Sequence, residues 1–140
     1  MTGRAQGWKV LIVDDEADNV EMTKILLEFH GAEVRIAENG LEGMTIAAEF
    51  VPTLILLDLS MPEMDGWEMF KAIREKPELK DVRVIALTAH AMPKDSERAL
   101  QFGFDDYITK PFLFDDFMEH IEKCVLKGGS SLSPEKVNTR

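Results

Sequence analysis

Short apolar runs alternate along the chain with segments in which apolar residues recur every three or four positions. Three runs are almost wholly apolar and lie at Val10 to Val13, Leu54 to Leu57 and Val82 to Leu87. Runs of this length are typical of strands that are buried on both faces of a sheet. Two further candidates, Glu33 to Ala37 and Asp106 to Thr109, alternate in polarity or are short, which predicts edge strands.

The segments between these runs have the spacing of amphipathic helices, and each ends near a Gly or a Pro. The apolar positions are Met22, Ile25, Leu26 and Phe29; Leu41, Met44 and Ala48; Met69, Phe70 and Ile73; and Phe114, Phe117, Met118, Ile121 and Val125. A further helix is expected over Pro93 to Phe102. We expect the Met and Phe stripes to pack in the core rather than to bind a cofactor.

The strict alternation of strands and helices predicts right-handed crossovers, and therefore a parallel sheet with helices on both faces. If the two edge-like strands lie outermost, the simplest strand order is 2-1-3-4-5. This order is the flavodoxin-like arrangement of a doubly wound, five-stranded α/β domain. The chain changes direction between the first and third strands, so we expect a ligand crevice beyond the carboxyl ends of these two strands.

The length, net charge and cysteine content of the chain limit the kinds of partner, the location and the number of domains to expect. The chain has 140 residues and a formal net charge of -10 at pH 7, which disfavours nonspecific binding to nucleic acid. Its one cysteine, Cys124, cannot form an internal disulfide, and no apolar run is long enough to span a membrane. We therefore expect a cytoplasmic protein with one domain over residues 8–127 and flexible ends at 1–7 and 128–140.

Polar residues follow each buried strand, at the edge of the sheet where this fold binds its ligands. They are Asp14, Asp15 and Glu16 after the first strand, Asp58 after the third, Thr88 after the fourth and Lys110 after the fifth. A single Asp after a strand is usually a helix cap or a turn residue. Two carboxylates about 4 Å apart, however, repel by roughly 4 kcal/mol at an effective dielectric constant near 20. The convergence of several carboxylates therefore predicts a bound cation, and oxygen ligands favour Mg²⁺.

Carboxylates, Mg²⁺, an ammonium group and a hydroxyl are the groups that phosphoryl transfer requires. The metal and Lys110 would neutralise charge on the phosphoryl oxygens, and one carboxylate would act as the nucleophile and become an acyl phosphate. Asp58 is the expected nucleophile because its strand lies between the strand that ends at Asp14 and Asp15 and the strand that ends at Thr88.

Four segments together resemble the receiver domain of two-component response regulators. They are IVDDE at 12–16, LLDLSMPEMDGWE at 56–68, ALTAHAM at 86–92 and FDDYITKPF at 104–112. The resemblance covers about residues 8–127, and it is closest to single-domain regulators and to receivers of hybrid histidine kinases.

The resemblance implies a phosphoprotein that accepts a phosphoryl group from a sensor histidine kinase or a histidine phosphotransfer protein. It would catalyse only its own phosphorylation and dephosphorylation, and phosphorylation would switch its binding of a downstream target protein. No DNA-binding output domain is expected, because only 13 residues follow Lys127.

The resemblance also implies a role for each site residue. Asp58 would be the phosphoacceptor, and Asp15, Asp58 and the backbone carbonyl of Ser60 would bind Mg²⁺ directly. Asp14 would bind the metal through water, and Lys110 would pair with the phosphoryl oxygens.

Two further pairs of residues would control the signal. Thr88 and Tyr107 would form the switch, with Thr88 bonding to the phosphoryl group and Tyr107 turning inward behind it. Ser60 and His90 would tune dephosphorylation, because they flank the line of attack of water in similar receivers. The fourth helix, fifth strand and fifth helix would form a face for a partner or for a homodimer. The alternative is a constant monomer that binds only its kinase, through the first helix.

Two other classes of protein share parts of this pattern. Mg²⁺-dependent phosphohydrolases with an aspartyl nucleophile usually have DxDx[TV] after the first strand, whereas this chain has Asp14, Asp15 and Glu16 there. An FMN-binding electron carrier would need a first loop rich in Ser, Thr and Gly, and three carboxylates would repel the FMN phosphate. The phosphohydrolase remains the alternative.

Overall fold

The computed structural model of this chain describes residues 5–59, 61, 64–88, 93–110, 117–119 and 121–123. Five parallel strands form one sheet in the order β2-β1-β3-β4-β5. The strands are β1 (Lys9–Val13), β2 (Glu33–Ala37), β3 (Leu54–Asp58), β4 (Arg83–Thr88) and β5 (Asp106–Thr109). The predicted strand order is confirmed.

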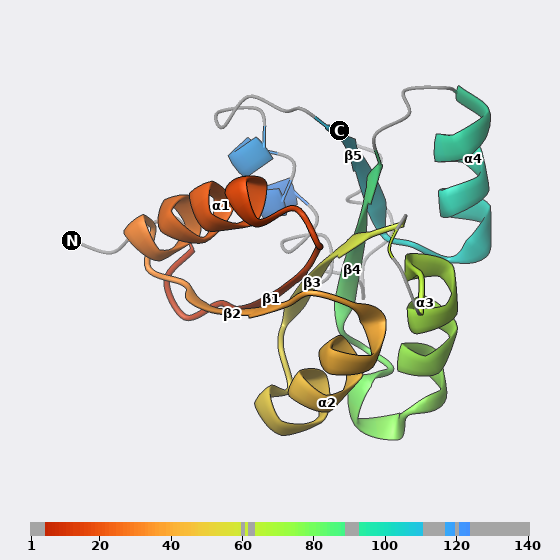
Figure 1. Ribbon diagram of the computed structural model, residues 1–140, viewed down its shortest axis with the longest axis horizontal. Helices are drawn as coiled ribbons and strands as arrows, with labels where there is room; N and C mark the ends of the chain where they lie inside the picture. The colour runs from red at the N-terminus through yellow and green to blue at the C-terminus, as the bar shows by residue number, and fades with distance from the viewer. Residues whose placement is uncertain are drawn as a thin grey trace.

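Helices cover both faces of this sheet, as predicted. They are α1 (Ala17–Phe29), α2 (Gly40–Phe50), α3 (Gly66–Glu75) and α4 (Pro93–Phe102), with a 3₁₀ turn η1 at Pro77–Leu79. Residues 117–119 and 121–123 are also helical and lie with α1 on one face, while α2, α3 and α4 lie on the other (Figure 1). Gly31 and Gly103 have φ angles of +100° and +123° and follow the ends of α1 and α4, where glycine is favoured. Among the described residues, no helix has the length and apolar character that a membrane crossing needs.

The core consists of two apolar layers, one on each side of the sheet. Successive residues of a strand point to opposite faces, so Leu11 packs in the layer beneath α2 and α3 while Ile12 packs in the layer beneath α1. Nearly every residue of β1, β3 and β4 is buried, whereas β2 alternates between exposed and buried positions. The burial expected for central and edge strands is therefore confirmed.

Most of the apolar stripe predicted for α1 faces away from the core. Met22, Ile25 and Phe29 are 50%, 54% and 80% exposed, whereas Leu26 is partly buried against the core. The fully buried apolar side chains of α1 are Val20 and Leu27. The prediction that the Met and Phe stripe of this helix is core packing is wrong. Because α1 is apolar on two sides, helical spacing alone does not identify the side that meets the sheet.

The stripe predicted for α2 is wrong at two of its three positions, since Leu41 and Ala48 are exposed while Met44 is partly buried against the core. Instead, α2 approaches the sheet through Gly43 and Ala47, and a Cβ atom at Gly43 would lie 3.1 Å from the Val13 side chain. A helix that lies this close to the sheet needs small residues at the contact, and a search for large apolar side chains does not find them. In α3, by contrast, the predicted residues Met69, Phe70 and Ile73 are all buried, and so are Phe117, Met118 and Ile121.

Candidate functional site

Three carboxylates meet at the carboxyl ends of β1 and β3. Asp14 and Asp58 are buried and Asp15 is exposed, and carboxylate oxygens of these three residues lie within 4.8 Å of one another. The structure thus brings together the acidic residues that the strand order placed at the crevice.

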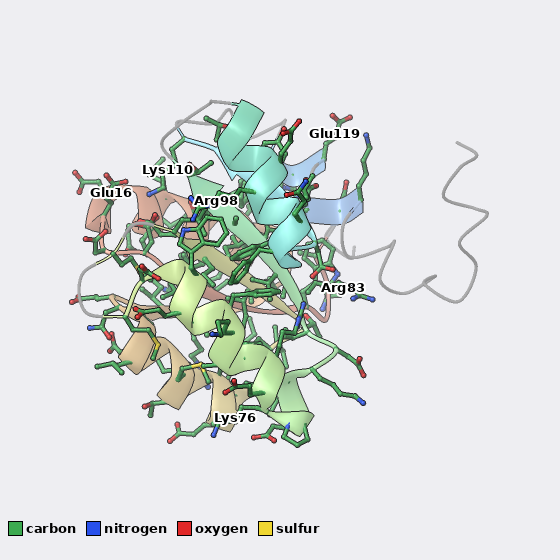
Figure 2. All side chains as sticks on the ribbon, turned by 90° about the vertical axis from the view of Figure 1, so that its right-hand side faces the viewer. Glu16, Lys76, Arg83, Arg98, Lys110 and Glu119 are labelled. Atoms are coloured by element: carbon green, nitrogen blue, oxygen red, sulfur yellow. The ribbon has the colours of Figure 1, made fainter. Side chains whose placement is uncertain are left out.

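Lys110 reaches into the same crevice from the end of β5. Its Nζ atom lies 2.9 Å from Asp14 Oδ2, 2.9 Å from Glu16 Oε1 and 3.4 Å from Asp58 Oδ2. Figure 2 shows Lys110 beside Glu16 at this edge of the molecule. The contact with Glu16 was not predicted, and Glu16 was not among the predicted site residues, although it directly follows Asp14 and Asp15.

Backbone hydrogen bonds hold these residues in place. The Asp14 N–H donates to the Ala37 carbonyl of β2, and the Glu16 N–H donates to Asp14 Oδ1. On the other side, the Lys110 N–H donates to the Thr88 carbonyl at 2.7 Å. The loops that carry the carboxylates and the ammonium group are therefore attached to neighbouring strands.

The electrostatic environment keeps Lys110 charged. Burial alone would lower the pKa of Lys110, but hydrogen bonds from its ammonium group to Glu16 and Asp14, and the charges of Asp14 and Asp58, raise that pKa well above its ordinary value. Lys110 is therefore a permanent cation in this crevice and available to pair with an anionic group.

The donor set of the crevice fits a hard divalent cation. Asp14, Asp15 and Asp58 offer only oxygen atoms, and these are close enough together for one ion to bind all three residues. Lys110 balances one of the three charges, so the remaining charge favours a cation over an anion. Oxygen ligands at this spacing suit Mg²⁺.

The turn that starts α3 packs directly against Asp58. A Cβ atom at Gly66 would lie 2.4 Å from the Asp58 carbonyl oxygen and 2.7 Å from Leu59 Cα, so only glycine fits. Asp65 and Glu68, on either side of Gly66 in the chain, form a reciprocal capping box at the start of α3. Gly66 was not among the predicted site residues, although Asp65-Gly66 is a recognisable turn signal.

The other predicted residues lie at or beyond the same edge. Thr88 is buried at the last position of β4, and Tyr107 is half-buried on β5, where it pairs in register with Ala86 and packs against the α2 to α4 side of the core. Ser60 and His90 lie outside the described residues, so their predicted roles remain predictions.

Comparison with known proteins identifies the family. A family model described as the response regulator receiver domain matches residues 10–122. The polar-differentiation response regulator DivK of Brucella anthropi is 41% identical over 113 residues, which cover 81% of this chain and 92% of DivK.

Solved structures agree with this match. A CheY-like response regulator receiver domain protein from Methanospirillum hungatei superposes with a TM-score of 0.80 at 31% identity, covering 89% of this chain and 98% of that one. The signal receiver domain of a signal transduction histidine kinase from Syntrophus aciditrophicus superposes with a TM-score of 0.77 at 33% identity, covering 86% of this chain and 91% of that one. The chain therefore belongs to the response regulator receiver domain family, which acts in two-component signalling.

Proposed function

We propose that this receiver accepts a phosphoryl group on Asp58 from the phosphohistidine of a sensor histidine kinase or a histidine phosphotransfer protein. One observation carries the proposal. The buried carboxylate of Asp58 has the Lys110 ammonium group 3.4 Å away and carboxylate oxygens of Asp14 and Asp15 within 4.8 Å. A bound cation and the Lys110 ammonium group can therefore both contact the Asp58 carboxylate.

The transfer moves one phosphoryl group between two protein side chains. A carboxylate oxygen of Asp58 attacks phosphorus, the bond from phosphorus to the imidazole nitrogen breaks, and its electron pair stays on the imidazole, which takes up a proton. Lys110 pairs with the phosphoryl oxygens as Asp58 becomes an acyl phosphate. Asp14, Asp15 and Asp58, with the Ser60 carbonyl, would bind Mg²⁺, which when bound neutralises charge on those oxygens.

Dephosphorylation returns Asp58 to a free carboxylate by hydrolysis, and the histidine donor takes no part in this step. Water attacks phosphorus and loses a proton, the bond to the Asp58 oxygen breaks, and the carboxylate and inorganic phosphate result. We infer that Ser60 and His90 set the rate of this step, so that exchanging either changes dephosphorylation more than phosphorylation. These reactions on its own Asp58 are the only ones that the proposal assigns to the chain.

A test uses acetyl phosphate as the donor and intact-mass spectrometry as the readout. The wild type should gain a phosphoryl mass only when Mg²⁺ is present, and Asp58→Asn should gain none. Asp81→Asn, which alters an exposed Asp at the opposite end of the sheet, is the matched control and should react like the wild type. An unchanged phosphoryl mass on Asp58→Asn would refute the assignment of Asp58, and steady turnover of p-nitrophenyl phosphate would favour the phosphohydrolase alternative.

We infer that Thr88 and Tyr107 transmit the signal. Thr88 ends the strand next to that of Asp58, and Tyr107 lies on the following strand, so an inward movement of Thr88 toward the phosphoryl group changes the space beside the Tyr107 ring. Coupling by one hydrogen bond and one repacked ring is on the order of 1 to 3 kcal/mol. Thr88→Ala should still be phosphorylated but should lose most of the gain in partner or dimer affinity, and a full gain would exclude this route.

We also infer that the exposed face of α1 binds the phosphoryl donor. Met22, Ile25 and Phe29 form an apolar stripe on the helix that begins directly after Asp15 and Glu16. A contiguous exposed apolar surface commonly marks a site of protein interaction. This assignment places the donor's histidine close to the crevice.

A second surface would carry the output. We propose that the face of α4, β5 and the helical residues 117–119 and 121–123 binds the downstream target or a second copy, and that phosphorylation strengthens this binding. Sedimentation with and without beryllofluoride, which mimics the phosphoryl group on Asp58, would test the homodimer.

We also propose that the folded unit spans residues 8–127, with flexible ends at 1–7 and 128–140, and limited proteolysis would test these limits. The proposed cytoplasmic location is testable by cell fractionation.

A further inference from the structure

The ammonium group of Lys110 divides its hydrogen bonds unequally among three carboxylates. Lysine has three donors, and the contacts to Asp14 and Glu16 are both 2.9 Å while the contact to Asp58 is 3.4 Å. The Lys110 side chain is 8% exposed and that of Glu16 is 58% exposed. An exposed carboxylate thus holds the buried ammonium group as closely as the buried Asp14 does.

Glu16 makes this contact at the cost of a local one. It occupies the N-cap position of α1, yet its side chain makes no capping hydrogen bond. In α2 and α3 the N-cap residues Asn39 and Asp65 accept a hydrogen bond from the backbone N–H three residues later. Glu is a poor choice for an N-cap, and a broken local rule is expected where a residue serves a site.

The loop that carries Glu16 also fixes its direction. The Glu16 N–H donates to Asp14 Oδ1, and Lys110 binds both Asp14 Oδ2 and Glu16 Oε1, so the three residues form a closed ring of contacts. Asp58 lies outside this ring and receives the longest of the three contacts.

We propose that Glu16 is a positioning residue that draws the Lys110 ammonium group toward the mouth of the crevice and away from Asp58. This inference rests on the proposed role of Asp58 and deepens it. Without the negative charge of Glu16, the ammonium group would move closer to Asp58 and compete with Mg²⁺ for the same carboxylate. Glu16 therefore keeps Asp58 available to the metal while leaving Lys110 within reach of the phosphoryl group.

The experiment measures the Mg²⁺ dissociation constant by NMR titration of backbone amides in a double-mutant cycle. Glu16→Gln keeps the size of the side chain and removes its charge, and Lys110→Met removes the group through which Glu16 is proposed to act. In the protein that retains Lys110, Glu16→Gln should weaken Mg²⁺ binding by about 3-fold to 10-fold, which lies in the lower part of the range for a coupled pair. In the Lys110→Met background, the same substitution should change Mg²⁺ binding by less than about 2-fold.

A matched control removes a nearby charge that the proposal does not use. Asp18 is an exposed Asp in the first turn of α1, and Asp18→Asn should leave Mg²⁺ affinity within about 2-fold of the wild type. Lys110→Gln replaces Lys110→Met if thermal unfolding shows that the apolar side chain disrupts the fold.

The outcomes separate this inference from the proposed function. An equal loss of Mg²⁺ affinity in both backgrounds would mean that Glu16 acts by its charge alone, and no loss in either would mean that it does not act; both results overturn the inference and leave Asp58 as phosphoacceptor. A loss for Asp18→Asn as large as that for Glu16→Gln also overturns it. Failure of the wild type to bind Mg²⁺ would refute the metal site and the inference together.

Discussion

The helices α1 and α3 both begin at the crevice, but they use their residues differently. In α3 the apolar stripe is buried, and a capping box closes its first turn. In α1 a stripe of similar size is exposed, and the N-cap side chain binds Lys110 instead of the helix. The buried stripe and capping box of α3 therefore hold the site in place, whereas α1 presents its apolar side chains and Glu16 to groups outside the helix.

The largest expected difference between the two helices is in the burial of isoleucine. Ile73→Ala in α3 removes a fully buried side chain and should lower the free energy of unfolding by about 4 kcal/mol. Ile25→Ala in α1 removes a side chain that is 54% exposed and should change it by less than about 0.5 kcal/mol. Urea unfolding of both variants measures the contrast, and equal losses would show that the stripe of α1 is buried in solution.

The next effect concerns the close approach of α3 to the phosphoacceptor. Gly66→Ala should lower the free energy of unfolding by about 3 kcal/mol and reduce phosphorylation, because the new methyl group meets backbone atoms of Asp58 and Leu59 that cannot move alone. Gly43→Ala is the matched control, and it should cost about 1 kcal/mol because its nearest neighbour is the flexible end of Met69. A mild effect of Gly66→Ala on both unfolding and phosphorylation would contradict this account.

A smaller effect is expected for the exposed side chains of α1. Here the rate of phosphotransfer should fall while the free energy of unfolding stays nearly the same. Exchanging Phe29 and Ile25 for Ser should lower the rate of phosphotransfer from a phosphorylated histidine donor about tenfold, because the donor loses apolar contact area. The rate with acetyl phosphate should stay unchanged, since this small donor needs no docking surface. Equal loss with both donors would place the defect in the crevice instead of on the surface of α1.

The smallest expected effect distinguishes the two N-caps. Asp65→Ala should lower the free energy of unfolding by about 1 kcal/mol, the usual cost of losing a cap that accepts a backbone N–H. Glu16→Ala should cost less than about half of that, because the Glu16 side chain is 58% exposed and makes no capping bond, and Lys110 keeps its contacts with Asp14 and Asp58. Thermal unfolding of the two variants gives the answer, and a larger cost for Glu16→Ala would mean that its contact with Lys110 stabilises the fold.

Much of the fold could be predicted because burial on both faces leaves a direct trace in sequence. The runs at β1, β3 and β4 can only be central strands, and this fixes where Asp14, Asp58 and Thr88 come together. The position of Lys110 follows from β5 lying at the edge next to β4.

Other features depend on distances that a local pattern does not contain. The pairing of Glu16 with Lys110 joins residues 94 positions apart, and it requires an exposed side chain to bend into the crevice. The burial of Val20 in place of Met22 depends on how α1 rotates against the sheet. Gly66 is needed because of the path of β3, which its own neighbours in sequence do not reveal.

The residue after Gly66 has an optical consequence. The Trp67 indole meets the rings of Phe102 and Phe104 edge-on at 5.0 Å and 5.6 Å, and the Arg98 guanidinium lies 4.8 Å from its centroid. The sequence contains one other tryptophan, Trp8, which precedes β1 at the amino end of the sheet. Indole emission responds to nearby charge and packing, so a Trp8→Phe protein carries a single tryptophan, next to the turn that packs against Asp58. Changes in the crevice can then be followed in real time without any attached dye.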